Sequence, residues 1–379
     1  MEKNIIEILC ELVNIPSFGS INNEHLIIKY LKKCFDDNSQ EIIGYTSENG
    51  NSHLLIGVNT KLSNIENGIL LSGHIDTVKQ SEGHEPISRI ENNSVIGLGS
   101  ADMKAFIASI ISNINSIKLM NKPVVISITT DEETDLYGIE NLIKRLQERN
   151  IKCDFSIVGE PTNSKFSVSS KGNSIMVSEM QGISCHSGLP ELGINAINLS
   201  VNFISVMKKI AEKYKGLATI CVTSMNGGQI PSNIVPDSCT TCFSVRTSDS
   251  NILNSIYAEL EYAHKEISLS LPNSKLYSVF AIPPFERRIS QKLENYSSER
   301  RIEIIDSLYS TEAGYIQQKF PTADIIIYGP GNPDCIHKAG ESVDIDELYN
   351  YKKNMLELIH NYSELNRNNN SNYSRVKKL

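Results

Sequence analysis

An α/β fold with an inserted α+β domain is predicted by the order of apolar patterns along this 379-residue chain. Up to residue 170, short apolar runs alternate with amphipathic helical patterns, which is typical of a mixed sheet between layers of helices. From Lys171 the strands alternate apolar and polar residues, as in a half-exposed antiparallel sheet, and near Pro284 the first pattern returns. We therefore expect a main domain formed by 1–170 and 284–365, an insertion at 171–283, and a disordered tail at 366–379.

The first part of the main domain is predicted from its periodicity and its helix breakers. Residues 1–36 indicate two amphipathic helices around a turn at Pro16–Ser20, because their apolar side chains recur at helical spacing. Asn121 and Pro123 end a later helix before the next strand begins. The strands expected here are His53–Val58, Gly68–Ser72, Val124–Thr130 and Phe155–Val158, and the further helices are about Lys104–Leu119 and Gly138–Asn150.

The insertion and the last part follow the same rules. The insertion should place two helices on one face of an antiparallel sheet. Its expected strands are 171–182, Ala218–Met225, Thr240–Thr247 and Lys275–Ala281, and its helices are about Ala196–Tyr214 and Ile252–Glu266. After it we expect a helix near Ile289–Glu294, a strand at Ala323–Tyr328 and a closing helix that ends near Leu365. The polar, Asn-rich tail has too few apolar residues to build a core, so we predict disorder.

Composition narrows the function classes. A formal charge of −8 disfavours nucleic acid as a partner, because no basic surface would attract phosphates. No apolar run approaches the roughly 18 residues of a membrane span, and acidic residues interrupt the N-terminal helix, so we expect a cytoplasmic protein without a signal peptide. The eight cysteines are scattered, which favours buried free thiols. Cys239 and Cys242 lie in a predicted strand and would face opposite sides, which disfavours a redox or zinc pair.

Ionisable residues follow the predicted strands at the points where those strands end. His74 and Asp76 close one strand, Asp131–Glu133 follow another, and Glu160 follows a third. Open α/β sheets place their sites at these ends. A histidine that binds a metal usually gives its other ring N–H to a carboxylate, so we expect His74 to be a ligand and Asp76 its orienting partner. The alternative is an ordinary acidic, solvated loop.

Asp102, after a Gly-rich turn, and His337, near the end of the chain, complete this set. Two histidines and several carboxylates without cysteine suit zinc, cobalt or manganese. The set exceeds what one tetrahedral ion uses, and it fits two ions that share a bridging carboxylate. Because Glu132 and Glu133 are adjacent, one can bind metal while the other takes a proton from the attacking water.

A series of motifs carries a resemblance to a known family. In chain order they are GHIDTV, GLGSADMKA, TTDEET, GEPT, CHSGLPELGINAI, GGQIPSNIVPDSCTTCFSVR, STEAGYIQQ and GPGNPDCIHKAGE. The chain resembles the co-catalytic metallopeptidases that include acetylornithine deacetylase, succinyl-diaminopimelate desuccinylase and glutamate carboxypeptidases. The resemblance covers about Ile5 to Leu365, and the TEA, GPG and His pattern resembles acetylornithine deacetylase most.

The resemblance implies a role for each matching residue of the main domain. One ion would be bound by His74 and Glu160, and the other by His337 and Glu133. The bridging ligand would be Asp102. Glu132 would be the general base, and Asp76 would orient His74.

The resemblance also implies that the insertion is a lid and dimerisation domain. In dimeric relatives a histidine that matches His186 stabilises the oxyanion across the subunit interface. Asn233 and Arg246 match positions that hold the substrate, and an arginine fork suits an α-carboxylate because it binds both oxygens. The chain has no Trp, where relatives often carry one before the bridging Asp, and Ser244 precedes Arg246 where relatives often have Asp. Both departures leave the acyl group and the amino acid open.

The function predicted is hydrolysis of the amide of an N-acyl amino acid by a cytoplasmic homodimer with two divalent ions, zinc first and cobalt or manganese as alternatives. N-acetylornithine, which gives ornithine and acetate in arginine biosynthesis, is the preferred substrate. The alternatives are a dipeptidase or carboxypeptidase and a deacylase of N-acetylcitrulline or N-succinyl-diaminopimelate. A non-catalytic binding protein would be expected to have lost Glu132 or a ligand, and the full set is present.

Overall fold

The computed structural model describes residues 4–18, 24–35, 40–47, 50–79, 81, 86–134, 136–230, 232–268, 271, 273–364 and 373–374. The chain divides into two compact units. The first comprises Met1–Ser169, Arg287–Asp306 and Tyr315–Leu379, and the second comprises Ser170–Glu286 and Ser307–Gly314. The sequence prediction kept Ser307–Gly314 in the main domain, whereas the structure groups this segment with the second unit.

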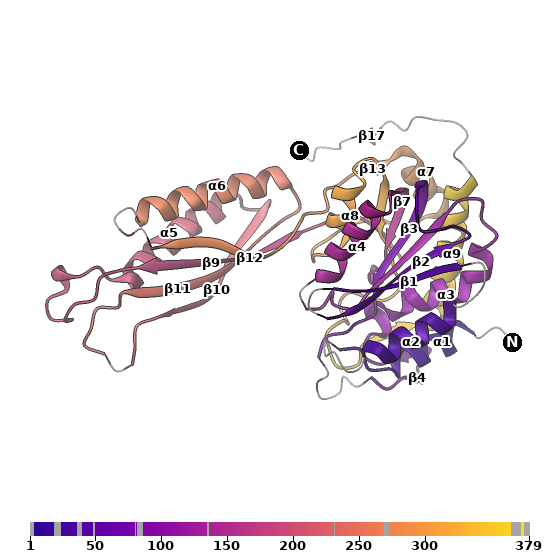
Figure 1. The fold of residues 1–379 in the computed structure, drawn as a ribbon, viewed down its shortest axis with the longest axis horizontal. Coiled ribbons are helices and arrows are strands. Elements are labelled where there is room, and N and C mark those ends of the chain that lie inside the picture. Colours follow the sequence, from indigo (N-terminus) through magenta and orange to yellow (C-terminus); the bar gives the residue numbers. More distant parts are fainter. Residues whose placement is uncertain are drawn as a thin grey trace. The chain divides into compact units, whose positions relative to one another are not determined.

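A mixed sheet forms the centre of the first unit (Figure 1). Among the described residues its strand order is β1-β2-β6-β3-β7-β15-β8-β14. Strands β6, β3, β7 and β15 run parallel, whereas β1, β2 and β8 pair antiparallel with their neighbours. The bounds are β1 Gln40–Thr46, β2 Ser52–Val58, β3 Ile65–His74, β6 Val124–Thr129, β7 Ile151–Val158, β8 Phe166–Ser170, β14 Ile304–Ser307 and β15 Asp324–Ile327.

Helices cover both faces of this sheet. Ile69 and Leu71 of β3 belong to the large core that α1, α2, α3 and α9 share, whereas Leu70 between them is equally buried and lies outside that core. Helix α4 packs against β6 and β7, and Figure 1 shows it across the sheet from α3 and α9. The helices are α1 Ile5–Val13, α2 Glu24–Phe35, α3 Ala105–Ile117, α4 Tyr137–Glu148, α7 Gln291–Arg300, α8 Ala313–Lys319 and α9 Ile345–Glu364.

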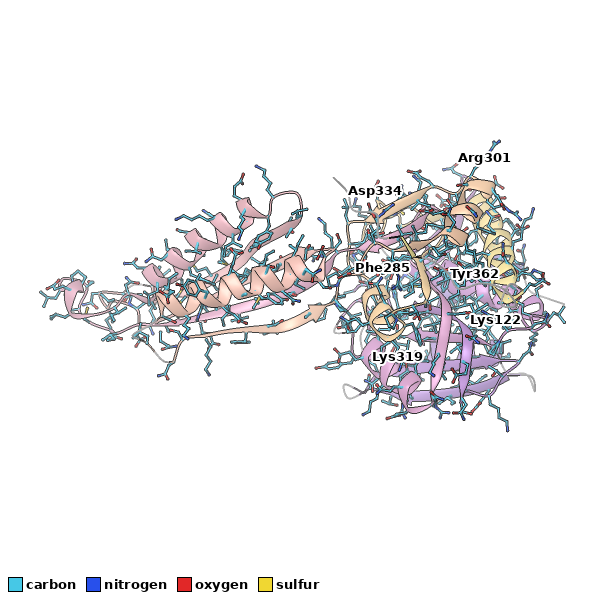
Figure 2. The ribbon with its side chains drawn as sticks, turned by 90° about the horizontal axis from the view of Figure 1, so that it is seen from above. Lys122, Phe285, Arg301, Lys319, Asp334 and Tyr362 are labelled. Atoms are coloured by element: carbon cyan, nitrogen blue, oxygen red, sulfur yellow. The ribbon has the colours of Figure 1, made fainter. Side chains whose placement is uncertain are left out.

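Local contacts fix where helices begin and how they are held. Asn4 and Glu7 form a capping box at the start of α1. The Asn4 side chain accepts the Ile6 N–H, and the Glu7 side chain accepts the Asn4 N–H. Tyr362 of α9, labelled in Figure 2, stacks on Phe155 with ring centroids 3.7 Å apart. Its hydroxyl also donates to Asp324 Oδ2 at 2.7 Å. These contacts tie the last helix to the middle of β7 and to the first residue of β15.

Two small sheets complete the first unit. One joins β4 (Arg89–Glu91), β5 (Ser94–Ile96) and β16 (Ser342–Asp344), and the other joins β13 (Ile289–Ser290) and β17 (Tyr373–Ser374). The predicted helix near Ile289–Glu294 therefore begins later, because Ser290 caps α7 by accepting the Leu293 N–H. The predicted disorder of 366–379 lies outside the described residues, except for β17, which is a short strand.

The second unit is an antiparallel sheet with two helices on one face. Its described strands follow the order β10-β11-β9-β12, and α5 and α6 pack over a core that includes Phe203 and Phe243. The bounds are β9 Gly172–Gln181, β10 Ala218–Gly227, β11 Ser238–Thr247, β12 Lys275–Ile282, α5 Ala196–Lys213 and α6 Ser250–Ile267. The main mixed sheet and this separate antiparallel sheet confirm the predicted fold class.

Other expectations are corrected in detail. Strands β1, β4, β5, β8 and β14 were not predicted; they are short or rich in polar residues, so their apolar pattern is weak. All eight cysteines lie in the described part of the chain and are free thiols. Only Cys153 and Cys239 among them are buried, and Cys221 is exposed, so the expected burial is wrong for most. None of the described helices is both long and apolar enough to cross a membrane.

The core of the second unit gives a stability prediction. Phe243 is fully buried and meets Phe203 edge-on with centroids 6.1 Å apart. Phe243→Ala should lower the free energy of unfolding by about 3–5 kcal/mol, because it leaves a cavity between sheet and helices. Urea unfolding measures this loss. The matched control is Val201→Ala on the exposed side of α5, where the residue is 48% exposed and the loss should stay below about 1 kcal/mol.

Candidate metal centre and catalytic site

Three neighbouring parallel strands bring the strand-end residues together. Strand β3 ends at His74, which lies beside Thr129 at the end of β6. Strand β7 lies on the other side of β3 and ends at Val158, two residues before Glu160. Because parallel strands present their carboxyl ends at one sheet edge, His74, Asp131–Glu133 and Glu160 converge there.

Asp102 reaches this edge from an irregular turn that precedes α3. The turn covers Ser100–Lys104, and Asp102 itself has non-helical backbone angles of φ −115° and ψ 93°. The Asp102–Met103 peptide bond is cis. Gly99 has a φ of 79°, and a Cβ there would lie 2.6 Å from the Thr77 side chain, so this turn requires glycine. The predicted helix accordingly begins at Ala105 rather than at Lys104.

The two carboxylate oxygens of Asp102 face two different histidines. His74 Nε2 lies 3.1 Å from Oδ1, and His337 Nε2 lies 3.2 Å from Oδ2. Glu133 Oε1 is 2.8 Å from His337 Nε2, and Glu160 Oε1 is 3.9 Å from His74 Nε2. The structure therefore brings together the five residues expected to bind metal, in two groups that share Asp102.

This donor set fits divalent cations. Ligand atoms of His74, Asp102 and Glu133 all lie within 4.8 Å of one another. Imidazole nitrogens and carboxylate oxygens are the ligands of zinc and of similar ions in catalytic sites. Gathered carboxylates repel one another unless a cation or protons lie between them.

Asp76 contacts both His74 and the turn Asp131–Glu133, which is called the acidic turn below. His74 Nδ1 lies 3.1 Å from the Asp76 carbonyl oxygen and 3.4 Å from Asp76 Oδ1. The buried Asp76 carboxylate also accepts the N–H groups of Glu132 at 3.3 Å and Glu133 at 3.0 Å. The expected contact with His74 is thus present, and the bonds to the acidic turn are a role that sequence reasoning missed.

His53 and Asp131 hold the same turn from its other side. Asp131 Oδ1 accepts the Gly138 N–H at 2.9 Å, and His53 Nε2 lies 3.7 Å from Asp131 Oδ2. His53 Nδ1 accepts the Thr130 N–H, so its proton is on Nε2, which faces Ser47 Oγ at 2.9 Å. The sequence suggests either a surface or a packing position for His53. Because His53 is fully buried, the structure shows a packing position. A histidine in an apolar strand was the available signal.

Lys104 is fully buried beside the metal centre. Its Nζ donates to the carbonyl oxygens of Leu12 at 3.0 Å and Ile15 at 3.1 Å. Burial lowers the pKa of Lys104 to about 7, although Glu341 and Asp76 oppose the shift. The sequence left open whether Lys104 screens the carboxylates or only begins a helix; the structure shows that it also fastens the end of α1 to this region.

Burial sets the protonation of the acids. Removal from water raises the pKa of Glu132, and the neighbouring carboxylates raise it further against the effect of His74. Burial raises the pKa of Glu160 and of Glu133 in the same way. Asp102 is the exception, because its hydrogen bonds with His337 and His74 outweigh burial and lower its pKa. Asp102 is therefore the carboxylate of this group that is most readily ionised.

The pKa values of His74 and His337 are raised, whereas burial alone would lower the pKa of an imidazole. Burial opposes protonation of His74, but hydrogen bonds with Asp102 and Asp76 raise its pKa above the ordinary value. Hydrogen bonds with Asp102 and Glu133 raise the pKa of His337 to about 10. Without a cation, the His337 imidazole therefore carries an extra proton at neutral pH, and the pKa of His74 is shifted in the same direction.

The three expected substrate-binding residues lie in the second unit. His186 is exposed, and its Nδ1 accepts the Gly188 N–H at 3.0 Å, so the neutral ring carries its proton on Nε2. Asn233 lies beside it, since its carbonyl oxygen accepts the Ser187 N–H at 2.8 Å. Arg246 of β11 donates to Ser310 Oγ at 3.4 Å, which joins the STEAG motif to β11.

Comparisons with known proteins identify the family of this chain. Residues 70–361 match Peptidase family M20/M25/M40. The chain belongs to this family. It is a metal-dependent M20-type hydrolase, which confirms the resemblance seen in its motifs.

Individual relatives of this M20 hydrolase cover nearly the whole chain. Acetylornithine deacetylase of Buchnera aphidicola subsp. Schizaphis graminum is 31% identical, across 95% of this chain and 98% of that protein. Acetylornithine deacetylase of Erwinia tasmaniensis is 28% identical over the same shares. Among solved structures, aminopeptidase PepT of Bacillus cereus matches with a TM-score of 0.78 and 19% identity, across 96% of this chain and 99% of that one. That likeness shows a shared fold.

The raised histidine pKa values predict that metal binding is linked to protons. An imidazole must lose its extra proton before it binds zinc, so zinc binding at pH 7 should release protons from His74 and His337. Apparent zinc affinity should rise with pH below those pKa values, by about tenfold per pH unit for each proton released. Calorimetry of the metal-free protein in buffers of different ionisation enthalpy measures the release.

Two histidine variants sharpen this measurement. His337→Ala should release fewer protons, whereas His360→Ala, which removes an exposed histidine of α9, should match the unchanged protein. Zinc binding without proton release would show that the imidazoles are already neutral.

Proposed function

We propose that this M20 hydrolase removes the acyl group from an N-acyl amino acid, with N-acetylornithine as the preferred substrate, giving ornithine and acetate for arginine biosynthesis. The observation that carries the reaction class is Asp102, whose two oxygens face His74 and His337 at nearly equal distances. The choice of substrate is supported by acetylornithine deacetylases that align with about 95% of the chain.

Two divalent ions, zinc first and cobalt or manganese as alternatives, are proposed at this centre. His74 and Glu160 would hold one ion, His337 and Glu133 the other, and Asp102 both. When bound, such ions polarise the acyl carbonyl and make water a better nucleophile.

Glu132 is proposed as the general base. Its backbone is fixed by Asp76, and it lies beside Glu133 in the acidic turn. Its raised pKa suits a group that takes a proton from the attacking water and then returns it to the leaving amine. Nearby cations would favour its ionised form in the resting enzyme.

The second unit is proposed to bind the substrate. Arg246 would hold the α-carboxylate through its guanidinium fork, and Asn233 would hold another polar group of the substrate. The Nε2–H of His186 points away from the bond that fixes Nδ1, so it is free to donate to the oxyanion.

A cytoplasmic homodimer is proposed as the working form. Strand β10 is an edge of the described antiparallel sheet, and its residues Cys221–Asn226 are all exposed. Such an edge is suited to pairing with another strand. This arrangement would allow His186 to act in the partner's site, as the resemblance implies.

The reaction itself can be tested directly. Purified protein loaded with zinc or cobalt should release ornithine from N-acetylornithine, and removal of the metal with a chelator should abolish release. Glu132→Gln should lower kcat by about 10²–10⁴-fold while metal still binds, because the base is lost and the ligands remain. Glu140→Gln, on the exposed side of α4, is the matched control and should keep full activity.

Substrate identity needs a panel beside N-acetylornithine. It contains N-acetylcitrulline, N-succinyl-diaminopimelate, other N-acyl amino acids, dipeptides and tripeptides. Faster turnover of another N-acyl amino acid would correct the substrate, and turnover of peptides alone would make the enzyme a peptidase. A metal-loaded protein that leaves the whole panel intact would contradict the proposed reaction.

Arg246 provides a separate prediction about specificity. Arg246→Lys should lower kcat/KM by about 10- to 100-fold, because an ammonium group cannot bind both carboxylate oxygens as a fork does. The loss should disappear for an N-acetyl amine that lacks the carboxylate. Arg149→Lys, whose guanidinium donates to the Leu62 carbonyl oxygen in the first unit, is the control and should retain normal kinetics. An equal loss on both substrates would rule out carboxylate recognition by Arg246.

A further inference from the structure

Glu341 is a buried acid that lies against the turn bearing Asp102. Its side chain is 1% exposed. Oε1 accepts the N–H groups of Ala101 and Asp102, each at 2.9 Å, and Oε2 accepts the Gly99 N–H at 3.0 Å. One carboxylate therefore holds the backbone amide of the residue expected to bridge two ions, together with two amides before it.

The backbone of Glu341 strengthens the same connection. Its carbonyl oxygen accepts the Gly97 N–H at 2.9 Å and the Ser100 hydroxyl at 3.2 Å. Asp102 lies in an irregular turn with non-helical backbone angles, so a regular helix does not define its position. The hydrogen bonds that Glu341 accepts fix the position of Asp102, although the two residues are more than 230 positions apart in sequence.

Charge explains why a glutamate suits this position. Hydrogen bonds between a carboxylate and backbone N–H groups are stronger than neutral ones, and they offset the cost of burying the charge. The buried ammonium of Lys104 also attracts Glu341. The three amides, and Lys104 when it is protonated, therefore stabilise the buried Glu341 carboxylate.

Glu341 also belongs to the loop that carries His337, four residues earlier. Two of the three residues proposed to hold the second ion, Asp102 and His337, thus lie on segments that Glu341 joins. Their side chains lie 3.2 Å apart. A shift of the turn relative to the loop would change this separation directly.

We propose that Glu341 is a positioning residue of the metal centre: it fixes the Asp102 turn against the His337 loop before any ion binds. This inference rests on the two-ion centre of the proposed function. It adds a residue that contacts neither ion nor substrate. The inference is independent of which amide the enzyme hydrolyses.

Glu341→Gln is the decisive variant. Glutamine keeps the size of the side chain, but its amide group is a donor, so it loses the bonds to at least one of Gly99, Ala101 and Asp102. In the metal-free variant, those amides should exchange with deuterium about 10- to 100-fold faster than in the unchanged protein. Zinc affinity, measured by competition with a chelator, should fall about 10- to 100-fold. The visible spectrum of the cobalt-loaded variant should also change.

Glu41→Gln is the matched control. Glu41 of the edge strand β1 accepts the Leu62 N–H at 2.6 Å, so its variant also removes a carboxylate bonded to a backbone amide. Its zinc affinity and cobalt spectrum should equal those of the unchanged protein. A general loss of stability would affect both variants, whereas positioning of Asp102 affects Glu341→Gln alone.

The outcomes separate cleanly. Unchanged zinc affinity in folded Glu341→Gln would overturn the proposal, even with faster exchange, because Glu341 would then be structural only. If that variant does not fold, hydrogen–deuterium exchange of the unchanged protein without metal tests the proposal instead. Slow exchange at Gly99, Ala101 and Asp102 supports the proposal, and exchange as fast as at exposed amides overturns it. Failure to hydrolyse N-acetylornithine would reject the proposed substrate and leave this test unaffected.

Discussion

Repulsion among buried carboxylates is the constraint on which this structure depends. The parallel strands β6, β3 and β7 deliver acids to one sheet edge, and each acid must find a compensating group there. The structure sorts them by the group they find. Asp76, Asp131 and Glu341 accept backbone N–H groups, and Asp76 and Asp131 also lie near an imidazole. Asp102 and Glu133 lie closer to imidazole nitrogens, at 2.8–3.2 Å. The first kind builds the scaffold, and the second kind is left for a cation.

This sorting gives each ligand-bearing turn its own support. Asp76 holds the amides of the acidic turn, and Glu341 holds those of the turn that carries Asp102. The backbone therefore reaches its shape through hydrogen bonds within the protein. A centre held in this way loses little conformational freedom when ions bind, which favours a defined coordination geometry.

The sequence could group the residues expected to bind metal because much of their signal is local: an ionisable residue follows an apolar strand, and neighbouring parallel strands end together. The structure places these residues close to one another, and their role as metal ligands stays a prediction. It could not identify Glu341, because a carboxylate that accepts distant backbone amides has no residue-type pattern to mark its partners. The same reason hid the support from His53. It also missed that Ser307–Gly314 groups with the second unit, where Thr311 lies 3.4 Å from Ser170 Oγ and Ser310 accepts from Arg246.

Specificity among amide substrates requires more than the shared fold. An aminopeptidase that is 19% identical shares the fold with a TM-score of 0.78, and deacetylases near 30% identity align over the same length. A peptide bond and an N-acetyl group are both amides, so one arrangement of ions and base can attack either. Discrimination must therefore come from groups that bind the ends of the substrate. In this chain we expect such groups around Arg246 of β11.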